Sequence, residues 1–432
     1  MRSSRPRCAA DSRSERTVVS NSEPEVTKRR NLPSLTGARW WAAFAVFVLH
    51  ALVFLPVYPF QKSSTFETIH RFVPMQLGAA GVTFFFVLSG FVIYWSFRPG
   101  SSTWQFYWRR ALKIYPTHIV AALVFIVAAS VPLSRAVVWV PNLLLVHTWV
   151  PKWTMVGGLN VPSWSLCAEI LFYACFPLSM PLISRIKSNQ LYWAFGILVL
   201  VIATIHVSYF VFVDGPRGIG NIFAPRLLPG DVSPMFEIHA SPAWFAQDDI
   251  PVSPSYWLSY TFPLSRLPEF FIGVLTARMV LEGYWRNIRL TPPLGVLAVA
   301  FAATWVVPIN FKMSALLVVP VAAVVATLAA RDLAGIKGLN SSRPMVWLGD
   351  ISYAFYMIQF PVMVVLTRLF IGGNAYDFAG WFFWAAVSLV VSIGAAYLIY
   401  IAVDQPLMKR FARRRAPSST HDAVENTAGV HQ

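Results

Sequence analysis

Charged side chains are scarce in this sequence. They make up only 12% of its 432 residues, whereas an ordinary soluble domain carries about 25%, and 56% of the residues are hydrophobic. A soluble fold has too little interior to cover so much apolar surface, so this composition excludes a soluble globular protein. Uncharged stretches such as 191–213 and 381–403 are long enough to cross about 30 Å of hydrocarbon, which indicates membrane-spanning helices.

Cysteine is also rare, which limits the covalent and metal chemistry open to the chain. Its three cysteines, Cys8, Cys167 and Cys175, provide neither a disulfide framework nor the ligand spacing of a zinc site, and the histidines form no metal-ligand set. The sequence also lacks a G-x-S-x-G elbow, a P-loop and an H-E-x-x-H motif. A metal cofactor, a serine hydrolase, a nucleotide hydrolase and a zinc protease therefore have no support.

Positive charge, by contrast, is abundant, with a formal net charge of +16. The basic residues flank the apolar stretches and form no stripe interleaved with aromatics, so we expect no nucleic-acid partner. Every second loop between the stretches is poor in Lys and Arg, as the positive-inside rule requires. The basic clusters lie at 2–30, 98–113, 185–187, 278–289, 331–343 and 409–415. We therefore expect a multi-pass protein of the cell (inner) membrane with both termini in the cytoplasm.

Apolar length and flanking charge predict an all-α, polytopic transmembrane helix bundle of about ten spans. The spans are expected near 40–57, 77–97, 117–133, 164–183, 191–213, 260–281, 294–307, 314–330, 351–371 and 381–403. Residues 136–150 are apolar but contain a proline, and they are interpreted as a re-entrant or interfacial segment. The longest outward loop is expected from Asp214 to Ser259. The predicted parts are a disordered basic tail (1–33), a transmembrane domain (34–406) and a second basic tail (407–432).

Ionisable residues inside a spanning helix are costly, and by default they mark a pathway or a reaction site. In the first span Arg39 and His50 are eleven residues apart, which places them on one helix face with a rise of about 16 Å. We expect Arg39 at the cytoplasmic mouth and His50 near mid-membrane. The guanidinium can hold phosphate there while a neutral imidazole serves as base deeper in. The alternative is a snorkelling arginine and an interhelical hydrogen bond from the histidine.

A carboxylate stands out in the fourth span, where Ser165, Glu169 and Tyr173 recur every four residues and so line one stripe. A carboxylate inside the membrane must be paired or protonated. Glu169 is therefore a candidate for orienting His50 or for binding a substrate hydroxyl. A structural hydrogen bond to a neighbouring helix is the competing interpretation.

Two other groups of charged residues lie in or beside the spans. Arg266 and Glu269 are spaced i and i+3 in the sixth span, which favours an ion pair on one helix face. Arg109, Arg110 and Lys113 lie just inside the membrane after the second span. They are either topology anchors or phosphate ligands, and charge alone does not separate the two.

Seven segments, taken in order, carry a resemblance to a known family. They are SLTGARWWAAFAVFVLH (Ser34–His50), GVTFFFVLSGFVI (Gly81–Ile93), FYWRRALKIYP (Phe106–Pro116), PSWSLCAEILFY (Pro162–Tyr173), SRLPEFFIGVLTA (Ser265–Ala277), LGDISYAFYMIQFPV (Leu348–Val362) and VDQP (Val403–Pro406). Together they resemble the acyltransferase-3 family of multi-pass membrane O-acyltransferases. The resemblance implies transfer of an acyl group, commonly acetyl, from a cytoplasmic acyl-coenzyme A to a hydroxyl group.

The resemblance also implies roles for individual residues. Arg39 and His50 occupy the pair regarded as essential in the family. Arg110 and Lys113 occupy its R-x-x-R element, which is proposed to meet the phosphates of the donor. Lys113 departs from Arg there and lacks the bidentate fork of a guanidinium, which puts its part in donor binding in doubt. Gln359 stands where many members carry histidine, so we assign no acid–base role to that position.

With these roles, His50 is expected to act as the general base, Arg39 to hold the donor, and Glu169 to orient His50 or the acceptor. Asp404 stands where many members carry Glu. The chain resembles the stand-alone members, which have no extracytoplasmic hydrolase-like domain, and the expected acceptor is a carbohydrate, a glycolipid or an antibiotic-type molecule. A proton-coupled transporter is the alternative, because polar residues in a helix bundle also describe a proton relay.

Overall fold

The structure is a computed structural model, and it describes residues 30–55, 59–60, 63–98, 100–131, 133–213, 254–372 and 374–411. A compact unit begins at Asn31 and contains all the described helices. Most of the two predicted tails and almost all of the predicted outward loop 214–259 lie outside the described residues. The described part of the second tail, 407–411, belongs to helix α18 (Gln405–Phe411). The cytoplasmic location of the two ends of the chain therefore stays a prediction.

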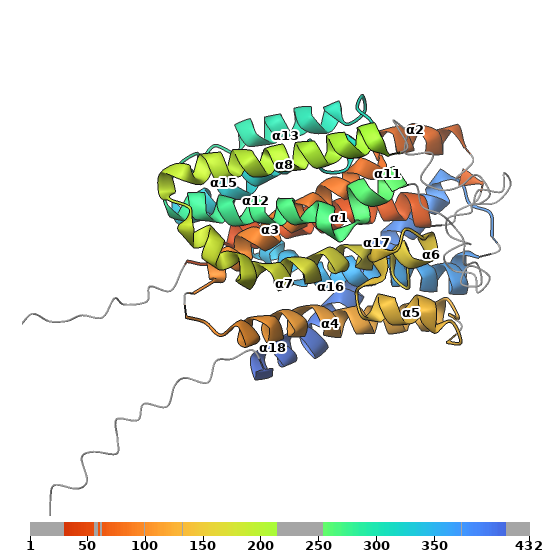
Figure 1. Cartoon of the computed structure of the whole chain (residues 1–432). Coiled ribbons are helices and arrows are strands. Elements are labelled where there is room, and N and C mark those ends of the chain that lie inside the picture. Colours follow the sequence, from red (N-terminus) through yellow and green to blue (C-terminus); the bar gives the residue numbers. More distant parts are fainter. Residues whose placement is uncertain are drawn as a thin grey trace, which may run out of the picture. The chain divides into compact units, whose positions relative to one another are not determined.

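The predicted fold class, an all-α polytopic bundle, is confirmed, since the described residues contain many helices and no strand. Figure 1 shows the long helices running alongside one another. The long helices are α1 (Pro33–Phe54), α3 (Met75–Ser96), α4 (Thr103–Ala128), α7 (Trp164–Arg185), α8 (Leu191–Phe212), α12 (Pro263–Leu281), α13 (Thr291–Ala303), α15 (Val318–Leu333), α16 (Arg343–Leu366) and α17 (Phe378–Ile399). In the centre, α1 packs against α3 and α16, and α12 packs against α3, α7, α8 and α15.

Within the described ranges, seven helices are long and apolar enough to cross a membrane: α1, α3, α4, α7, α8, α16 and α17. The other three predicted spans correspond to α12, which contains buried charges, and to the shorter helices α13 and α15. Each predicted span thus falls on a helix. The number of crossings, ten, stays a prediction.

Two helices begin well before the predicted spans that they contain. Helix α4 begins at Thr103, fourteen residues before the predicted start, and α16 begins at Arg343, eight residues before it. A hydropathy boundary marks where the hydrocarbon begins, whereas a helix continues until its backbone amides find another partner. At α4 the side chain of Ser102 supplies that partner by accepting a hydrogen bond of 3.4 Å from the amide of Gln105.

Several short helices gather at one end of the bundle. They include α2 (Ser64–Phe72), α5 (Ala136–Leu143), η2 (His147–Trp149), α6 (Trp153–Val156), η3 (Val161–Ser163), α11 (Pro254–Tyr256), η7 (Trp257–Thr261) and α14 (Ile309–Lys312). In Figure 1, α2, α5, α6 and α11 lie at the right. The segment 136–150 forms only α5 and η2, and eight residues of helix are too short to cross about 30 Å. This agrees with its interpretation as a segment that does not span.

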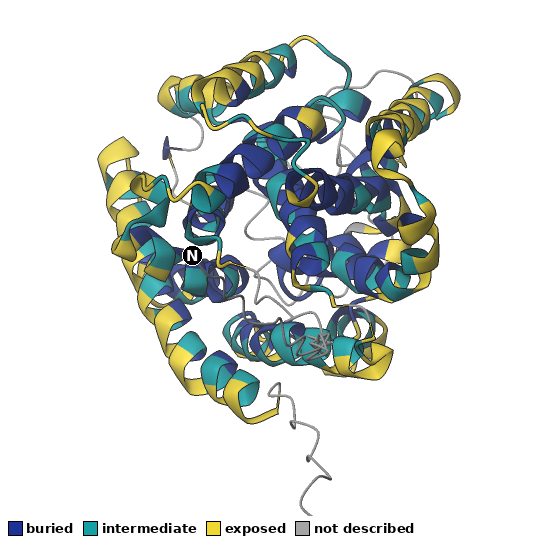
Figure 2. Cartoon of the chain, turned by 90° about the vertical axis from the view of Figure 1, so that its left-hand side faces the viewer, coloured by how far each residue is buried: buried dark blue, intermediate teal, exposed yellow. Residues whose placement is uncertain are grey.

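Burial follows the pattern of a membrane bundle. Figure 2 shows buried residues on the helix faces that meet in the interior and exposed residues on the faces that point outward. Many exposed side chains are large and apolar, such as Leu178 at 77% and Val299 at 72% exposure. On a soluble protein such a surface would be a liability, whereas lipid tails solvate it well.

Glycines bring the central helices into backbone contact. A Cβ atom added to Gly273 of α12 would clash with the carbonyl oxygen of Val87 in α3, and one added to Gly349 of α16 would clash with that of Thr36 in α1. Close approach of this kind is typical of helix pairs in membranes. The contact between Gly349 and Thr36 fixes the first turns of α1 against α16, directly before Arg39.

Candidate active site

The start of α1 is held in place by hydrogen bonds that position Arg39. The carboxylate of Asp332 at the end of α15 accepts hydrogen bonds from the amide of Ser34 at 2.8 Å and from its hydroxyl at 2.6 Å. It thereby satisfies backbone donors that the first helical turn leaves free and places a negative charge at the positive end of the helix dipole. Arg39 lies five residues after Ser34. The backbone before it is therefore held both by Asp332 and by the contact of Thr36 with Gly349.

Arg39 faces a group of carboxylates in the interior. Its guanidinium interacts electrostatically with Glu169 of α7, with Asp350 of α16 and with Asp404 of η10 (Tyr400–Asp404). Three helices that are far apart in the sequence therefore place acidic groups around one cation. This arrangement favours a role for Arg39 in the interior over that of a residue that only snorkels to the lipid headgroups.

Glu169 belongs to the same group of charges. Its carboxylate accepts a hydrogen bond of 3.3 Å from the hydroxyl of Tyr173, one turn further along α7. It also interacts electrostatically with Arg39, Arg110 and Lys113. The structure thus brings together four of the five residues that the sequence proposed, and it places Glu169 among the cations.

Lys113 has a defined partner. Its ammonium group lies 3.5 Å from a carboxylate oxygen of Asp404, and it sits over the ring of Tyr353 at 5.4 Å. The hydroxyl of Thr117, one turn along α4, donates a hydrogen bond of 2.6 Å to the other oxygen of Asp404. Because Asp404 already balances the charge of Lys113, this lysine is less available to an anionic ligand than its sequence position indicates.

Arg110 lies between this group of charges and a cavity. Its guanidinium lies 5.8 Å from the ring centres of Phe106 and Tyr173, and it lines a cavity of about 340 Å³ between the end of α3 and the start of α4. Arg98 and Arg109 line the same cavity. Three guanidinium groups around one hollow suit a phosphate-bearing ligand.

The polar groups of this cavity also include the hydroxyls of Ser101 and Ser102 and the amide of Gln105. The described residues that line it include no carboxylate. Sequence reasoning placed Arg98 in a basic cluster but did not propose it as a ligand. The sequence could have indicated Arg98 as a ligand, because Arg98 and Ser102 flank the short connection between α3 and α4.

His50 lies further along α1, about 16 Å from Arg39 by helical rise. It is 8% exposed, and its ring meets the edge of Phe54, whose ring in turn meets Phe360 of α16. Only four residues separate His50 from the end of α1. It therefore lies in the second half of α1, and its expected position near mid-membrane stays a prediction.

Further buried polar side chains lie on α7 and α16. The hydroxyls of Ser165 and Tyr356 are 3.0 Å apart, and Tyr356 also donates to the carbonyl of Pro162 at 3.2 Å. Gln359 donates to the carbonyl of Tyr356 at 3.2 Å, and its amide oxygen has no hydrogen-bond partner among the described residues. The sequence shows polar stripes on the two helices, but it does not show that Ser165 and Tyr356 meet.

We refer to these polar side chains together as the polar column. It comprises Arg98, Arg109 and Arg110 of the cavity, the charges around Arg39 and Glu169, the hydroxyl pair of Ser165 and Tyr356, and His50. These groups offer cations to an anionic molecule and an imidazole for acid–base chemistry.

Two further polar contacts lie outside this column. Arg266 and Glu269 form an ion pair of 2.9 Å with both side chains buried, so the predicted ion pair on one helix face is confirmed. His147 contacts the thiol of Cys167 at 3.3 Å, a contact that the sequence did not indicate. Among the described residues, no group of histidine, cysteine, aspartate and glutamate side chains is arranged to hold a metal ion.

Comparison with known proteins identifies a family and two similar proteins. Residues 32–401 match a family model described as an acyltransferase domain. The chain is 35% identical over 413 residues to "Acyltransferase MdmB" of Streptomyces mycarofaciens, covering 92% of this chain and 97% of that protein. It is 26% identical over 374 residues to "Exopolysaccharide production protein ExoZ" of Rhizobium meliloti (strain 1021), covering 81% and 94%. No solved structure matches the chain significantly.

Proposed function

The chain belongs to the family of this acyltransferase domain, and from that premise we propose that it is an acyl-coenzyme A-dependent O-acyltransferase of the cell (inner) membrane. Its donor is acyl-coenzyme A, most simply acetyl-CoA, and its acceptor is a hydroxyl group. The observation that carries the proposal is the cavity lined by Arg98, Arg109 and Arg110 at the entrance to the polar column.

The cavity and the column suit the two parts of this donor. The phosphates of coenzyme A are strongly anionic, and guanidinium groups hold phosphate through paired, charge-assisted hydrogen bonds. The rest of the donor is an uncharged arm that ends in the thioester. With its phosphates in the cavity, the arm extends past Arg39 and Glu169 toward His50. The 16 Å between Arg39 and His50 is then the distance that the arm crosses.

His50 is the proposed general base. It takes the proton from the acceptor hydroxyl as the oxygen attacks the thioester carbonyl, so a C–O bond forms while the C–S bond breaks. The proton then passes to the departing sulfur, and the products are an ester and free coenzyme A thiol. A positioned base of this kind accelerates such a step by about 10²–10⁴-fold.

Arg39 and Glu169 act nearer the entrance. Arg39 orients the donor arm below its phosphates, and its guanidinium interacts electrostatically with the carboxylates of Glu169, Asp350 and Asp404. Glu169, held by Tyr173, accepts a hydrogen bond from the donor arm or from an acceptor hydroxyl. The sequence also allowed Glu169 to orient His50. We favour that role less, because the partners described for Glu169 are Tyr173 and the cations.

The acceptor belongs to a carbohydrate, a glycolipid or an antibiotic-type molecule. The name of the similar Rhizobium protein, which concerns exopolysaccharide production, supports a saccharide. The buried hydroxyls of Ser165 and Tyr356 are suited to binding such a hydroxyl-rich molecule near His50.

The test is release of free thiol by the purified protein from acetyl-CoA in the presence of candidate acceptors. His50→Gln keeps hydrogen-bonding capacity but cannot accept a proton near neutral pH, so it should lower the rate by about 10²-fold or more. His206→Gln is the matched control, because His206 is a buried histidine of α8 that interacts electrostatically with Arg266 and is not part of the polar column. It should keep close to the native rate.

Two results would contradict the proposal. If His50→Gln transfers the acyl group at close to the native rate, His50 is a packing residue and the base must be sought elsewhere, first at Glu169. If no acceptor gives thiol release while the protein moves a solute in vesicles under a proton gradient, the chain is a transporter.

A further inference from the structure

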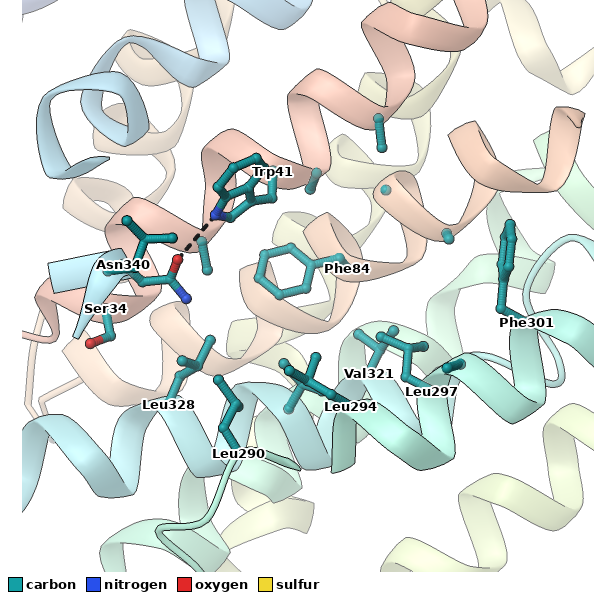
Figure 3. Close-up of a pocket in the computed structure, with 18 of the residues that line it drawn as sticks. Ser34, Trp41, Phe84, Leu290, Leu294, Leu297, Phe301, Val321, Leu328 and Asn340 are labelled. Atoms are coloured by element: carbon teal, nitrogen blue, oxygen red, sulfur yellow. Dashed lines mark hydrogen bonds between the residues drawn. The ribbon is translucent and has the colours of Figure 1, made fainter. Parts of the chain in front are cut away.

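A groove on the side of the bundle lies away from the polar column. It has a volume of about 610 Å³ and is bounded by α1, α3, α13 and α15 (Figure 3). Nearly all the side chains that line it are apolar, and polar groups occur only at one end, where Ser34 and Asn340 lie in Figure 3. Phe301 lies toward the other end. The groove thus has a polar end and an apolar body.

Small residues on two helices create this space. Ala38, Ala42 and Ala45 of α1 line one wall, and Ala80 and Gly81 of α3 line the next. The two helices are in close contact there, since a Cβ atom on Gly81 would lie 2.6 Å from the carbonyl oxygen of Ala42. The opposite wall is α13, a helix of 13 residues whose main helical neighbour in the described structure is α15. Apolar walls gain dispersion contacts only from atoms that lie between them, so a hydrocarbon chain is a better occupant of this groove than water.

The length of the groove matches one leaflet of a bilayer. Along α1 it extends from Ser34 to Ala45, a rise of about 16 Å, and along α13 it extends from Leu290 to Phe301, again about 16 Å. The hydrocarbon of a whole bilayer is about 30 Å thick. The groove therefore accommodates the chain of a lipid in one leaflet, and its polar end is the end at which α1 begins.

The polar end provides donors for an anionic headgroup. Arg331 of α15 donates one N–H to a backbone carbonyl at 3.0 Å, and the guanidinium carries further N–H groups. Asn340 accepts a hydrogen bond of 3.1 Å from Trp41 through its side-chain oxygen, and its amide nitrogen has no partner among the described residues. The nearby carboxylate of Asp332 is already bound by the amide and hydroxyl of Ser34.

From these observations we infer that the groove binds one anionic diacyl phospholipid of the leaflet in which α1 begins. One acyl chain lies between α1 and α13, and the phosphate accepts hydrogen bonds from Arg331 and from the amide nitrogen of Asn340. A polyprenyl phosphate fits less well, because its longer chain extends beyond a groove that ends after about 16 Å. The lipid fastens α13 to the rest of the bundle. This inference does not depend on acyl transfer.

The test measures lipid binding by the full-length protein in detergent. Native mass spectrometry with added phosphatidylglycerol should show one tightly held lipid, and phosphatidylcholine should bind less well. A phosphatidylglycerol with a photoreactive group in its acyl chain should label the segments 34–45 and 290–301. Arg331→Gln should weaken binding of phosphatidylglycerol by about tenfold, since it removes a charge-assisted contact to the phosphate.

A matched pair of substitutions tests the groove itself. Ala298→Phe places a ring in the groove and should abolish tight lipid binding and lower the temperature of unfolding. Ala203→Phe is the same change at an exposed position of α8 and should alter neither property. If Ala298→Phe does not fold, the lipid affinity of Arg331→Gln and the labelling pattern of the native protein test the inference instead. Equal binding of phosphatidylglycerol by Arg331→Gln, labelling outside the two segments, or retention of a polyprenyl phosphate in place of a diacyl lipid would overturn the inference.

Discussion

The pair formed by Lys113 and Asp404 makes it possible to separate charge balance from donor binding. We predict that Lys113→Ala lowers the free energy of unfolding by about 1–2 kcal/mol. This value lies between the effect of an exposed pair, about 1 kcal/mol or less, and that of breaking a fully buried pair, about 3–5 kcal/mol. The intermediate value follows from the geometry, because Asp404 is 3% exposed and Lys113 is 31% exposed at a separation of 3.5 Å.

The double variant Lys113→Ala/Asp404→Asn should recover most of this loss. It removes the carboxylate that Lys113→Ala leaves unbalanced, and the hydroxyl of Thr117 can still donate to the amide oxygen of the new asparagine. Thermal unfolding of each purified variant in the same detergent measures the effect. Arg110→Ala is the comparison, because Arg110 lines the cavity and contacts aromatic rings.

Kinetics then decide what Lys113 does. If the lysine only balances Asp404, the double variant has a native KM for acyl-coenzyme A, while Arg110→Ala raises this KM by about tenfold through loss of a charge-assisted contact. If Lys113 also binds the phosphates, the double variant keeps a raised donor KM although its stability is restored. A native unfolding temperature for Lys113→Ala alone would refute the reasoning, because the buried carboxylate would then not need its partner.

Two further predictions concern the packing of α12. Glu269→Gln should lower the free energy of unfolding by about 3 kcal/mol, because it leaves the fully buried Arg266 unbalanced. Arg266→Met/Glu269→Gln should recover part of this loss in the same denaturation assay. Gly273→Ala should lower the free energy of unfolding by about 1–3 kcal/mol, because the added Cβ atom forces α12 away from α3. Gly196→Ala is the control, since its Cβ atom meets no neighbouring atom, and it should leave the unfolding temperature unchanged or slightly raised. Equal effects of the two glycine substitutions would contradict the close contact between α12 and α3.

The fold class was predictable because hydrocarbon imposes a simple rule on sequence. A stretch such as 191–213 has no charged residue, and it forms α8 (Leu191–Phe212) almost as expected. Helix ends were less predictable, since α4 continues for fourteen residues beyond the apolar part of its sequence. Arg109, Arg110 and Lys113 consequently lie on a helix, where their directions are fixed by the helical repeat.

The site was predictable where its residues share one helix, and less so where it depends on contacts between helices. The spacing of Arg39 and His50 is a property of α1 alone, and the same holds for Arg266 and Glu269. The contacts of Lys113 with Asp404 and of Ser165 with Tyr356 join residues that are 291 and 191 positions apart. They depend on how the helices are rotated about their axes, which periodicity does not determine when most faces are apolar.

Under the proposed function, the charge balance of the polar column explains why the phosphates and the arm of the donor bind at different places. Arg39 and Lys113 face the carboxylates of Glu169, Asp350 and Asp404, so these positions offer little attraction to an additional anion. The cavity, by contrast, gathers the three guanidinium groups of Arg98, Arg109 and Arg110, of which Arg110 also interacts electrostatically with Glu169. Its excess of positive charge favours the phosphates there. The proposal therefore places the phosphates at the cavity and leaves the uncharged arm to continue toward His50.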